Sequence, residues 1–394
     1  MTGSANPHVT PNVTPRETGA STGPEELSRG VLVVGAGLLG TSVALALTAT
    51  GVDVRLRDCD ADALETALTM GAGRAEQDAD APAALAVVAV PPAQAGTAVT
   101  EILRSGAAEY ATDVASVKVL PAEQVRAGST TPGRYVGSHP MAGREVSGAR
   151  AALPDLFEGR PWVMCPDAST DQQAVVRTLA VARTCGAAPV TMAAASHDAA
   201  VALVSHAPHV VSALVAGLLV DAPAQQVRLA GPGVTDVTRV AAADPSMWSE
   251  ILQVNATAVR TVLTGLRDSL DDVLDSLSQV SGTQVSGQQP VRQNEQAARL
   301  DAALQRGVDG RFRLPGKHGL RGVDYDTVTI VVDDRPGQLA AVFADTDRIG
   351  VNVEDVRIEH RPGQPVGALQ LDVLAGHGAT LQDGLQQQGW TVHG

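Results

Sequence analysis

Aromatic residues and lysine are scarce in this sequence. Phe, Trp and Tyr make up 2% of its 394 residues, and of the 29 basic residues only Lys118 and Lys317 are lysine. The formal net charge is −14, and the basic residues form no run. Proteins bind nucleic acids and anionic membranes through clustered positive charge, so we expect neither as a partner. An anionic substrate would need individually placed arginines.

Cysteine is also rare. Cys59, Cys165 and Cys185 are an odd number without the paired spacing of a metal site, which is typical of a reducing compartment. The N-terminus has no basic region followed by an apolar one, so no signal peptide is expected. The most apolar stretch, residues 201–220, is interrupted by two histidines and a proline and is predicted to be a buried helix. We therefore expect a cytoplasmic protein.

A glycine-rich turn near the N-terminus carries the clearest motif. Residues 31–34 are four apolar residues typical of a buried strand, and Gly35-Ala36-Gly37-Leu38-Leu39-Gly40 follows directly, ahead of a predicted helix. In G-x-G-x-x-G the first glycine makes the turn, the second lets the backbone approach a pyrophosphate, and the third lets helix pack on strand. The helix N-terminus then faces the phosphates. The predicted cofactor contacts here are Gly35, Gly37, Leu38, Leu39 and Gly40.

Two further positions belong to the same predicted site. Asp58 ends the second strand, 21 residues beyond Gly37, where a carboxylate binds ribose hydroxyls and repels a 2′-phosphate. NAD is therefore favoured over NADP, although Arg55 and Arg57 lie close by in the sequence. Another buried strand ends at Val90-Pro91, at the carboxyl edge where such sheets bind ligands.

The order of predicted elements divides the chain. Alternating strands and helices predict an α/β fold with a Rossmann-type doubly wound sheet, and a long helical block follows. Such a block often packs two subunits together, although its apolar stripe over residues 259–277 would by itself more often be ordinary core. The last segment has the order βαββαβ, a ferredoxin-like pattern. The expected parts are a disordered tail (residues 1–28), an NAD-binding sheet domain (29–193), a helical substrate and dimerisation domain (194–306), a linker (307–325) and a small C-terminal domain (326–394).

Ser116 and His139 follow two neighbouring predicted strands. Both should reach the carboxyl edge of the sheet, where a hydroxyl and an imidazole would converge on one substrate atom. A neutral imidazole, with a pKa of about 6.5, suits removal of a hydroxyl proton while a hydride leaves the same carbon. The alternative is a histidine that only holds a glycine-rich turn together.

The helical block offers the remaining polar candidates. His206 and His209 share one helix face, but no third ligand lies at metal spacing, so we expect a polar pocket wall and no metal. Arg239 stands three residues after Asp236, and its guanidinium could clamp a carboxylate or form a salt bridge with Asp236. Trp248 lies on the helix that Asp244-Pro245 begins.

In combination these segments resemble the prephenate/arogenate dehydrogenase family over roughly residues 30–320, and the last segment resembles an ACT regulatory domain. The order of the motifs carries the resemblance more than any single one. They are the glycine turn, Asp113-Val114-Ala115-Ser116-Val117-Lys118, Ser138-His139-Pro140-Met141-Ala142-Gly143-Arg144-Glu145-Val146-Ser147-Gly148, Ser205-His206-Ala207-Pro208-His209, Asp236-Val237-Thr238-Arg239, Asp244-Pro245 with Trp248, Leu314-Pro315-Gly316-Lys317-His318-Gly319, and Asp334-Arg335-Pro336-Gly337-Gln338-Leu339.

The resemblance implies NAD-dependent oxidative decarboxylation of prephenate to 4-hydroxyphenylpyruvate, in tyrosine biosynthesis. By it, His139 is the base on the C4 hydroxyl, Ser116 orients that hydroxyl and the nicotinamide, and Arg239 binds the side-chain carboxylate. Val234-Thr235 departs from the family, which commonly has a larger apolar residue and an arginine there. The pocket would further be lined by His206, His209 and Glu145 and bordered by Trp248 and Asp236.

Several alternatives stay open at this point. Arogenate could replace prephenate, or the chain could be a 3-hydroxyacid dehydrogenase of similar build. Such an enzyme would be expected to use a lysine or a His-Glu pair in the helical block, and this block has no lysine. A non-catalytic NAD- or amino-acid-sensing protein is a third possibility. For the ACT-like segment, the resemblance implies that tyrosine or a related aromatic amino acid binds near Asp334, Gly337 and Asn352 of a homodimer; the alternative is a domain that only dimerises or has lost its ligand.

Overall fold

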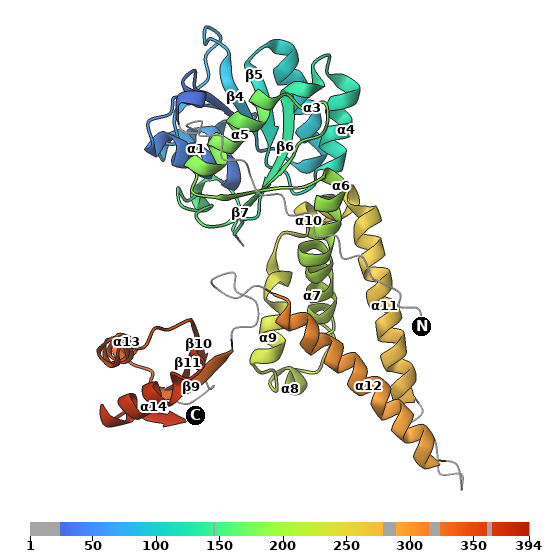
Figure 1. Ribbon diagram of the computed structural model, residues 1–394, viewed down its shortest axis with the longest axis vertical. Helices are drawn as coiled ribbons and strands as arrows, with labels where there is room; N and C mark the ends of the chain where they lie inside the picture. The colour runs from blue at the N-terminus through green and yellow to red at the C-terminus, as the bar shows by residue number, and fades with distance from the viewer. Residues whose placement is uncertain (1–23, 145, 279–288, 315–323, 361–364, 394) are drawn as a thin grey trace, which may run out of the picture. The chain divides into compact units, whose positions relative to one another are not determined.

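The structure is a computed structural model that describes residues 24–144, 146–278, 289–314, 324–360 and 365–393 (Figure 1). Contacts divide the chain into two compact units, residues up to 230 with 234–264, and residues 231–233 with 265 onwards. Part of the predicted tail is ordered, because Pro24–Leu27 forms a short 3₁₀ helix that packs against α5 (Gln172–Thr184) and buries Leu27 in the core. The rest of that tail lies outside the described residues.

An eight-stranded sheet forms the centre of the first unit (Figure 1). The strand order is β3-β2-β1-β4-β5-β6-β7-β8, and neighbouring strands are parallel except β6 and β7, which are antiparallel. All the strands predicted for this domain are present, and the two-residue β3 is an addition to them. The strands are β1 (Val31–Val34), β2 (Val54–Arg57), β3 (Arg74–Ala75), β4 (Ala83–Val88), β5 (Ala108–Asp113), β6 (Tyr135–Pro140), β7 (Pro161–Cys165) and β8 (Ala188–Thr191).

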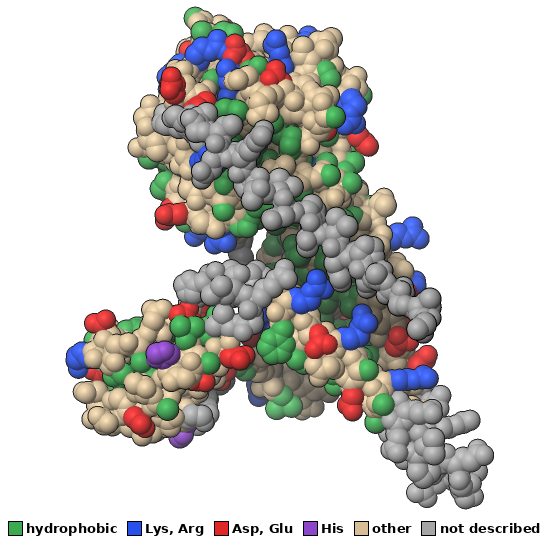
Figure 2. All heavy atoms as spheres, in the orientation of Figure 1, with side chains coloured by type: hydrophobic (Ala, Val, Ile, Leu, Met, Phe, Trp, Pro, Cys, Tyr) green, Lys and Arg blue, Asp and Glu red, His purple; other side chains and the backbone are tan. Residues whose placement is uncertain are grey.

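Helices bury both faces of this sheet. Val31 and Val33 of β1 join the core beneath α1 (Leu38–Ala49) and α5, whereas Leu32 joins the core beneath α3 (Pro92–Ser105) and α4 (Val119–Gly128). This alternation explains why β1 is apolar at every position. A further helix, α2 (Ala61–Thr69), lies beside β3. On the face drawn in Figure 2, basic side chains of this domain lie scattered among acidic ones.

The helical block begins with a helix whose middle turn is wider than an α-helix. A π-helical turn, Ala202–His206, separates α6 (Ala194–Val201) from α7 (Ala207–Gly217). Pro208 accounts for it, because proline has no amide hydrogen to bond the Val204 carbonyl and its ring crowds that carbonyl. The block continues with α8 (Ala224–Val227), α9 (Pro232–Thr238), the 3₁₀ helix η5 (Arg239–Ala242), α10 (Pro245–Val254) and α11 (Ala256–Ser278).

The prediction of a buried helix over residues 201–220 is wrong for the single chain. Leu214, Leu218 and Val220 are 67%, 76% and 81% exposed, and a third of the most apolar window in Ala194–Gly217 (33%) is buried. By length and composition this described helix could cross a membrane. A helix that packs against a second subunit can have the same length and composition, because it exposes apolar side chains that the partner then covers.

The second unit contains a small sheet with its own core. The strand order β10-β11-β9-β12, all antiparallel where register is defined, and the two helices give the predicted order βαββαβ. Its core is separate and includes Ile330, Leu369 and Leu381. The helix predicted over residues 296–306 is longer and reaches into the predicted linker. The elements are α12 (Gln289–Phe312), β9 (Tyr325–Asp333), α13 (Gln338–Ile349), β10 (Asp355–His360), β11 (Val366–Leu374), α14 (Gly378–Gln387) and β12 (Thr391–His393).

Candidate active site

The glycine turn between β1 and α1 has an open face. Gly35 has a φ of +104°, and a side chain on it would overlap the Ala89 carbonyl, just as one on Gly40 would overlap the Gly35 carbonyl. Nothing lies within 4 Å of the position that a side chain on Gly37 would take. A pyrophosphate therefore fits against Gly37 and the first turn of α1, which Leu38 and Leu39 begin.

Asp58 stands where β2 ends, beside this turn. Its carboxylate accepts hydrogen bonds from the amides of Ala36, at 2.5 Å, and Asp60, at 2.8 Å. A carboxylate has about four acceptor sites, so ribose hydroxyls can still bind it. Arg57 is held elsewhere, because its guanidinium makes a two-point ion pair with Glu76 at 2.5 and 2.7 Å, and this bond raises the Arg57 pKa.

Arg55, the other arginine near Asp58, is also engaged away from the turn. It is buried, and it donates to the backbone carbonyls of Ala81, at 2.5 Å, and Arg29, at 3.0 Å. Neither arginine is therefore poised for a 2′-phosphate. At the neighbouring strand end, Val90 and Pro91 form the turn that leads from β4 into α3.

A chain of hydrogen bonds begins at His139 on β6. Its Nδ1 lies 2.9 Å from Nε2 of His197, and Nδ1 of His197 lies 2.8 Å from the Asp198 carboxylate. Asp198 accepts two further bonds, from the backbone amides of Lys118 (2.7 Å) and Val119 (2.9 Å). The strand end and helix α6 are thereby joined in one network.

The network assigns the histidine tautomers. Because Asp198 can only accept, His197 carries its proton on Nδ1 and accepts on Nε2. His139 must then donate from Nδ1, which leaves its Nε2 as an unprotonated acceptor. Burial, with the neighbouring His197, Lys118 and His206, holds the pKa of His139 well below 6.5. The lowered pKa keeps the His139 ring neutral near pH 7, and the tautomer leaves Nε2 as the nitrogen that can accept a proton.

His206, His209 and Trp248 form one wall. The His209 ring stacks on the Trp248 indole, with centroids 3.7 Å apart and planes 5° apart, and His206 meets the same indole edge-on at 6.1 Å. Asn255 lies 3.1 Å from the His206 ring and donates to the Asp198 carbonyl at 2.9 Å, which ties the wall to the network. Burial lowers the pKa of His209 and lowers that of His206 to about 4, so both rings are neutral near pH 7.

Ser116 follows β5 at the same edge of the sheet. Its hydroxyl is buried and has no hydrogen-bond partner within the described chain. Buried hydroxyls are nearly always hydrogen-bonded, so an unpartnered one at the ligand-binding edge of the sheet is what a ligand-binding hydroxyl would show. Ser116 therefore fits a ligand that reaches the sheet edge.

The remaining predicted site residues do not belong to the hydrogen-bond network of His139 that the structure describes. Arg239 is exposed at the start of η5, which packs against α7, the helix of His209, and Asp236 is exposed on α9. Glu145 lies outside the described residues. In the second unit, Gly337 directly precedes α13 and has a φ of +88°. The Asp334 amide donates to the Pro365 carbonyl, and the Asn352 side chain donates to Glu354.

The sequence motifs gave no role to His197, Asp198, Lys118 or Asn255, although Lys118 lies within the motif of residues 113–118. Their position in the sequence could have indicated a role for His197 and Asp198, since they lie on α6, directly before the turn that carries His206. Among the described residues no group of three or more His, Cys, Asp and Glu side chains could hold a metal ion. Burial raises the pKa values of the Cys165 and Cys185 thiols to about 12, which makes them poor nucleophiles.

Two family models match this chain. Residues 43–191 match "Prephenate dehydrogenase, nucleotide-binding domain", and residues 193–285 match "Prephenate dehydrogenase, dimerization domain". The small C-terminal sheet lies outside both matches, so its ACT identity is not shown by them. A probable prephenate dehydrogenase of Streptomyces niveus is 35% identical over 309 residues, 78% of this chain and 84% of the relative. The prephenate dehydrogenase of Bacillus subtilis is 29% identical over 281 residues, 69% of this chain and 71% of the relative.

Solved structures give a consistent result. A prephenate dehydrogenase from A. aeolicus, in complex with hydroxyphenyl propionate and NAD⁺, is 26% identical with a TM-score of 0.61 and covers 72% of this chain and 96% of its own. A Synechocystis arogenate dehydrogenase is 26% identical with a TM-score of 0.58 and covers 72% of this chain and 98% of its own. With its glycine turn, its buried histidine network and two family matches that together span most of its length, this chain belongs to the prephenate dehydrogenase family.

Proposed function

We propose that this chain catalyses the NAD-dependent oxidative decarboxylation of prephenate to 4-hydroxyphenylpyruvate, with His139 as the base. The observation that carries the assignment is the hydrogen-bonded row His139–His197–Asp198, together with the buried, unpartnered hydroxyl of Ser116, which follows the neighbouring strand β5. The row leaves one unprotonated nitrogen, His139 Nε2, to accept a proton. A substrate with a hydroxyl on the carbon to be oxidised satisfies both His139 and Ser116.

His139 takes the proton of the C4 hydroxyl as that carbon loses a hydride and becomes a carbonyl carbon. Bound NAD⁺ supplies the hydride acceptor. Loss of CO₂ from C1 then sends its bonding electrons through the ring to the C4 oxygen, which regains a proton as the phenol forms. His197 accepts the hydrogen bond from His139 Nδ1–H and so stabilises the imidazolium, and Asp198 holds His197 in the required tautomer. The remaining work is alignment, because aromatisation drives the reaction.

Arg239 is proposed to bind the side-chain carboxylate, with His206, His209, Trp248, Asp236 and Glu145 around the ring. The wall of neutral rings beside Trp248 supports the placement of the substrate ring, since a flat cyclohexadiene packs well against aromatic faces. Gly35, Gly37, Leu38, Leu39, Gly40, Asp58, Val90 and Pro91 are proposed to hold NAD.

Arogenate is the second candidate substrate, because the likeness to the Synechocystis arogenate dehydrogenase is nearly as close as that to the A. aeolicus enzyme. Arogenate has an amino group where prephenate has a keto oxygen. The test is NADH formation with prephenate, arogenate and a panel of 3-hydroxyacids. Turnover of prephenate at least as efficient as that of arogenate supports the assignment, and turnover of a hydroxyacid alone refutes it.

A homodimer in the cytoplasm, formed through the helical block, completes the proposal. The support is the match to a dimerization domain over residues 193–285 together with apolar side chains that the single chain leaves exposed. On α11, Leu266, Leu270 and Leu274 are 45–55% exposed, so the predicted stripe is available to a second subunit. Light scattering or sedimentation would test this.

We also propose that the C-terminal sheet is an ACT domain that binds tyrosine or a related aromatic amino acid near Asp334, Gly337 and Asn352. The βαββαβ order and the open turn at Gly337, where a side chain would meet nothing within 4 Å, support this.

A further inference from the structure

Lys118 is fully buried at the carboxyl edge of the sheet. Its ammonium donates to the Asp113 carboxylate and, at 2.6 Å, to the backbone carbonyl of Ser138. The other Asp113 oxygen accepts a bond of 2.6 Å from the Tyr135 hydroxyl. A buried ammonium is costly to desolvate, so a site that keeps one charged supplies this many partners.

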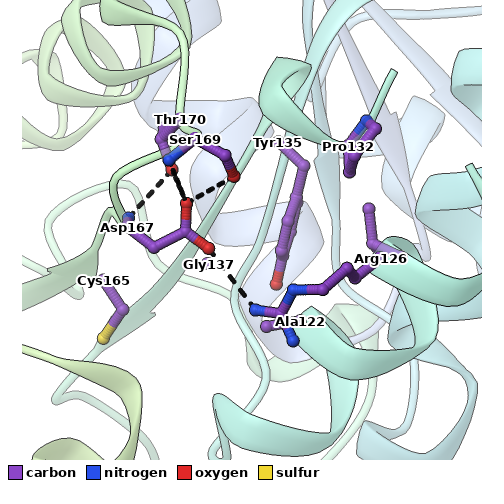
Figure 3. A pocket seen from close by; sticks show the side chains of 10 residues that line it. Ala122, Arg126, Pro132, Tyr135, Gly137, Cys165, Asp167, Ser169 and Thr170 are labelled. Carbon is purple, nitrogen blue, oxygen red and sulfur yellow. Dashed lines mark hydrogen bonds and ion pairs between the residues drawn. The ribbon is translucent and has the colours of Figure 1, made fainter. Parts of the chain in front are cut away.

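The surroundings leave this cluster little access to water, because the side chains of Lys118 and Asp113 are both 0% exposed. Tyr135 and Gly137 line a pocket of ≈ 20 Å³ between β6, β7 and α4, which is room for about one water molecule (Figure 3). A side chain on Gly137 would lie 3.0 Å from the Tyr135 hydroxyl and 3.3 Å from the Lys118 stem. Glycine at this position therefore leaves space for the cluster.

The hydrogen bonds close a ring through Lys118. Its side chain binds the carbonyl of Ser138, the residue before His139, and its backbone amide binds Asp198. Asp198 binds His197, and His197 binds His139. One residue thus fixes both the strand end that carries the base and the pair that orients the base.

Lysine is rare in this chain, which makes its presence at position 118 informative. The chain has two lysines among its 29 basic residues, so arginine stands at nearly every basic position. At residue 118 the compact ammonium binds one carboxylate oxygen and one carbonyl, and the whole side chain is buried. A planar guanidinium is larger and presents its donors in a fork, so it would not satisfy these two acceptors in the same volume.

We propose that Lys118 is a positioning residue for the base, holding His139 against His197 and opposing a second positive charge beside it. This rests on the proposed function of His139. The ionisable groups around His139 are His197 and His206, with Asp198 behind them, and the Lys118–Asp113 pair. Burial is the largest cause of the low His139 pKa, and His197 and then Lys118 lower it further.

The test compares Lys118→Met, the double variant Lys118→Met/Asp113→Asn, and Trp162→Phe. Asp113 is changed with its partner so that no unpaired carboxylate stays buried if the single variant does not fold. Trp162→Phe is the matched control, because it removes a neutral bond of 2.9 Å to the Ser138 hydroxyl and leaves the charges in place. The readouts are kcat, KM for both substrates, the pH profile of kcat/KM, and an NMR titration of the His139 ring, assigned with His139→Asn.

With Lys118 replaced, we expect kcat to fall ~10-fold or more and the acid limb of kcat/KM and the His139 titration to move up by ~0.5–1 pH unit, less in the double variant. Lys118→Met that folds should change KM for NAD⁺ little. A folded variant with an unshifted profile and titration would overturn the proposal, and so would the same shift in Trp162→Phe. A wild-type enzyme without prephenate-dependent NADH formation would instead refute the proposed function, and the NMR titration would still decide the role of Lys118.

Discussion

At the scale of single residues, the environment of His139 has the clearest consequence. The sequence predicts an imidazole with an ordinary pKa, whereas burial and three neighbouring cations or potential cations hold the pKa well below 6.5. The neutral, proton-accepting form therefore persists into more acidic solution. We expect log(kcat/KM) for prephenate to rise with slope one through a limb below the ordinary histidine range and to be flat above it.

His139→Asn should remove that limb and lower the rate by roughly 10²–10⁴, because a general base contributes about that much. The measurement is the pH dependence of kcat/KM with saturating NAD⁺. A profile in His139→Asn with the wild-type limb would assign the base to another group.

Arg239 should contribute more to substrate binding than to chemistry. Arg239→Ala is expected to raise KM for prephenate strongly with a smaller change in kcat, a loss of roughly 2–4 kcal/mol in kcat/KM. Arg228→Ala, which removes another exposed arginine at the end of α8, is the control and should leave KM unchanged. Equal changes in KM for the two variants would mean that Arg239 has no specific role in binding prephenate.

At the scale of elements, the end of β2 decides between NAD and NADP. Asp58 faces the glycine turn, and Arg57 next to it is ion-paired with Glu76. The Asp58 carboxylate would therefore repel a 2′-phosphate, and Arg57 would not be available to bind it. NADP⁺ should be a poor cofactor, and Asp58→Ser should narrow the difference in kcat/KM between the two cofactors. Asp58→Ser/Glu76→Gln should narrow it further by releasing Arg57, while Glu76→Gln alone should change little. Equal use of both cofactors by the wild type would contradict the argument.

The strands and helices also show which features of the fold could be predicted from the sequence. Apolar runs and glycine spacing predict the sheet, since β1 is buried on both faces and only glycine fits at Gly35 and Gly40. The contact between His139 and His197 could not be predicted in this way, because it joins residues 58 apart and depends on how α6 meets the sheet edge. The prediction that residues 201–220 are buried fails for a related reason, because an apolar pattern indicates burial but does not indicate whether the same chain or a second subunit covers it.

At the scale of the whole molecule, the buried neutral histidines link stability to pH. The pKa values of His139, His206 and His209 are lowered in the folded chain, whereas in the unfolded chain these residues titrate near 6.5. Below about pH 6.5 the unfolded state therefore binds more protons than the folded one, and stability falls with the pH until the folded pKa values are reached. We expect Tm to drop as the pH is lowered from 7 to 5, and to drop less in His206→Asn. The same decline in that variant would attribute the effect to other groups.

The last consequence concerns the small C-terminal sheet. Its core lies within residues 328–392 and shares no residue with the cores beneath the large sheet, so removing it should leave the catalytic unit folded. If tyrosine binds near Asp334, Gly337 and Asn352 and lowers activity, then tyrosine and prephenate must change each other's affinity by the same factor. We expect calorimetry to show tyrosine binding to the full chain, weakened by Asn352→Ala, which removes the amide that now bonds Glu354. A chain ending at Asp324 should keep its activity and lose the inhibition; inhibition that persists undiminished would place tyrosine in the active site, where its phenol ring would compete with prephenate.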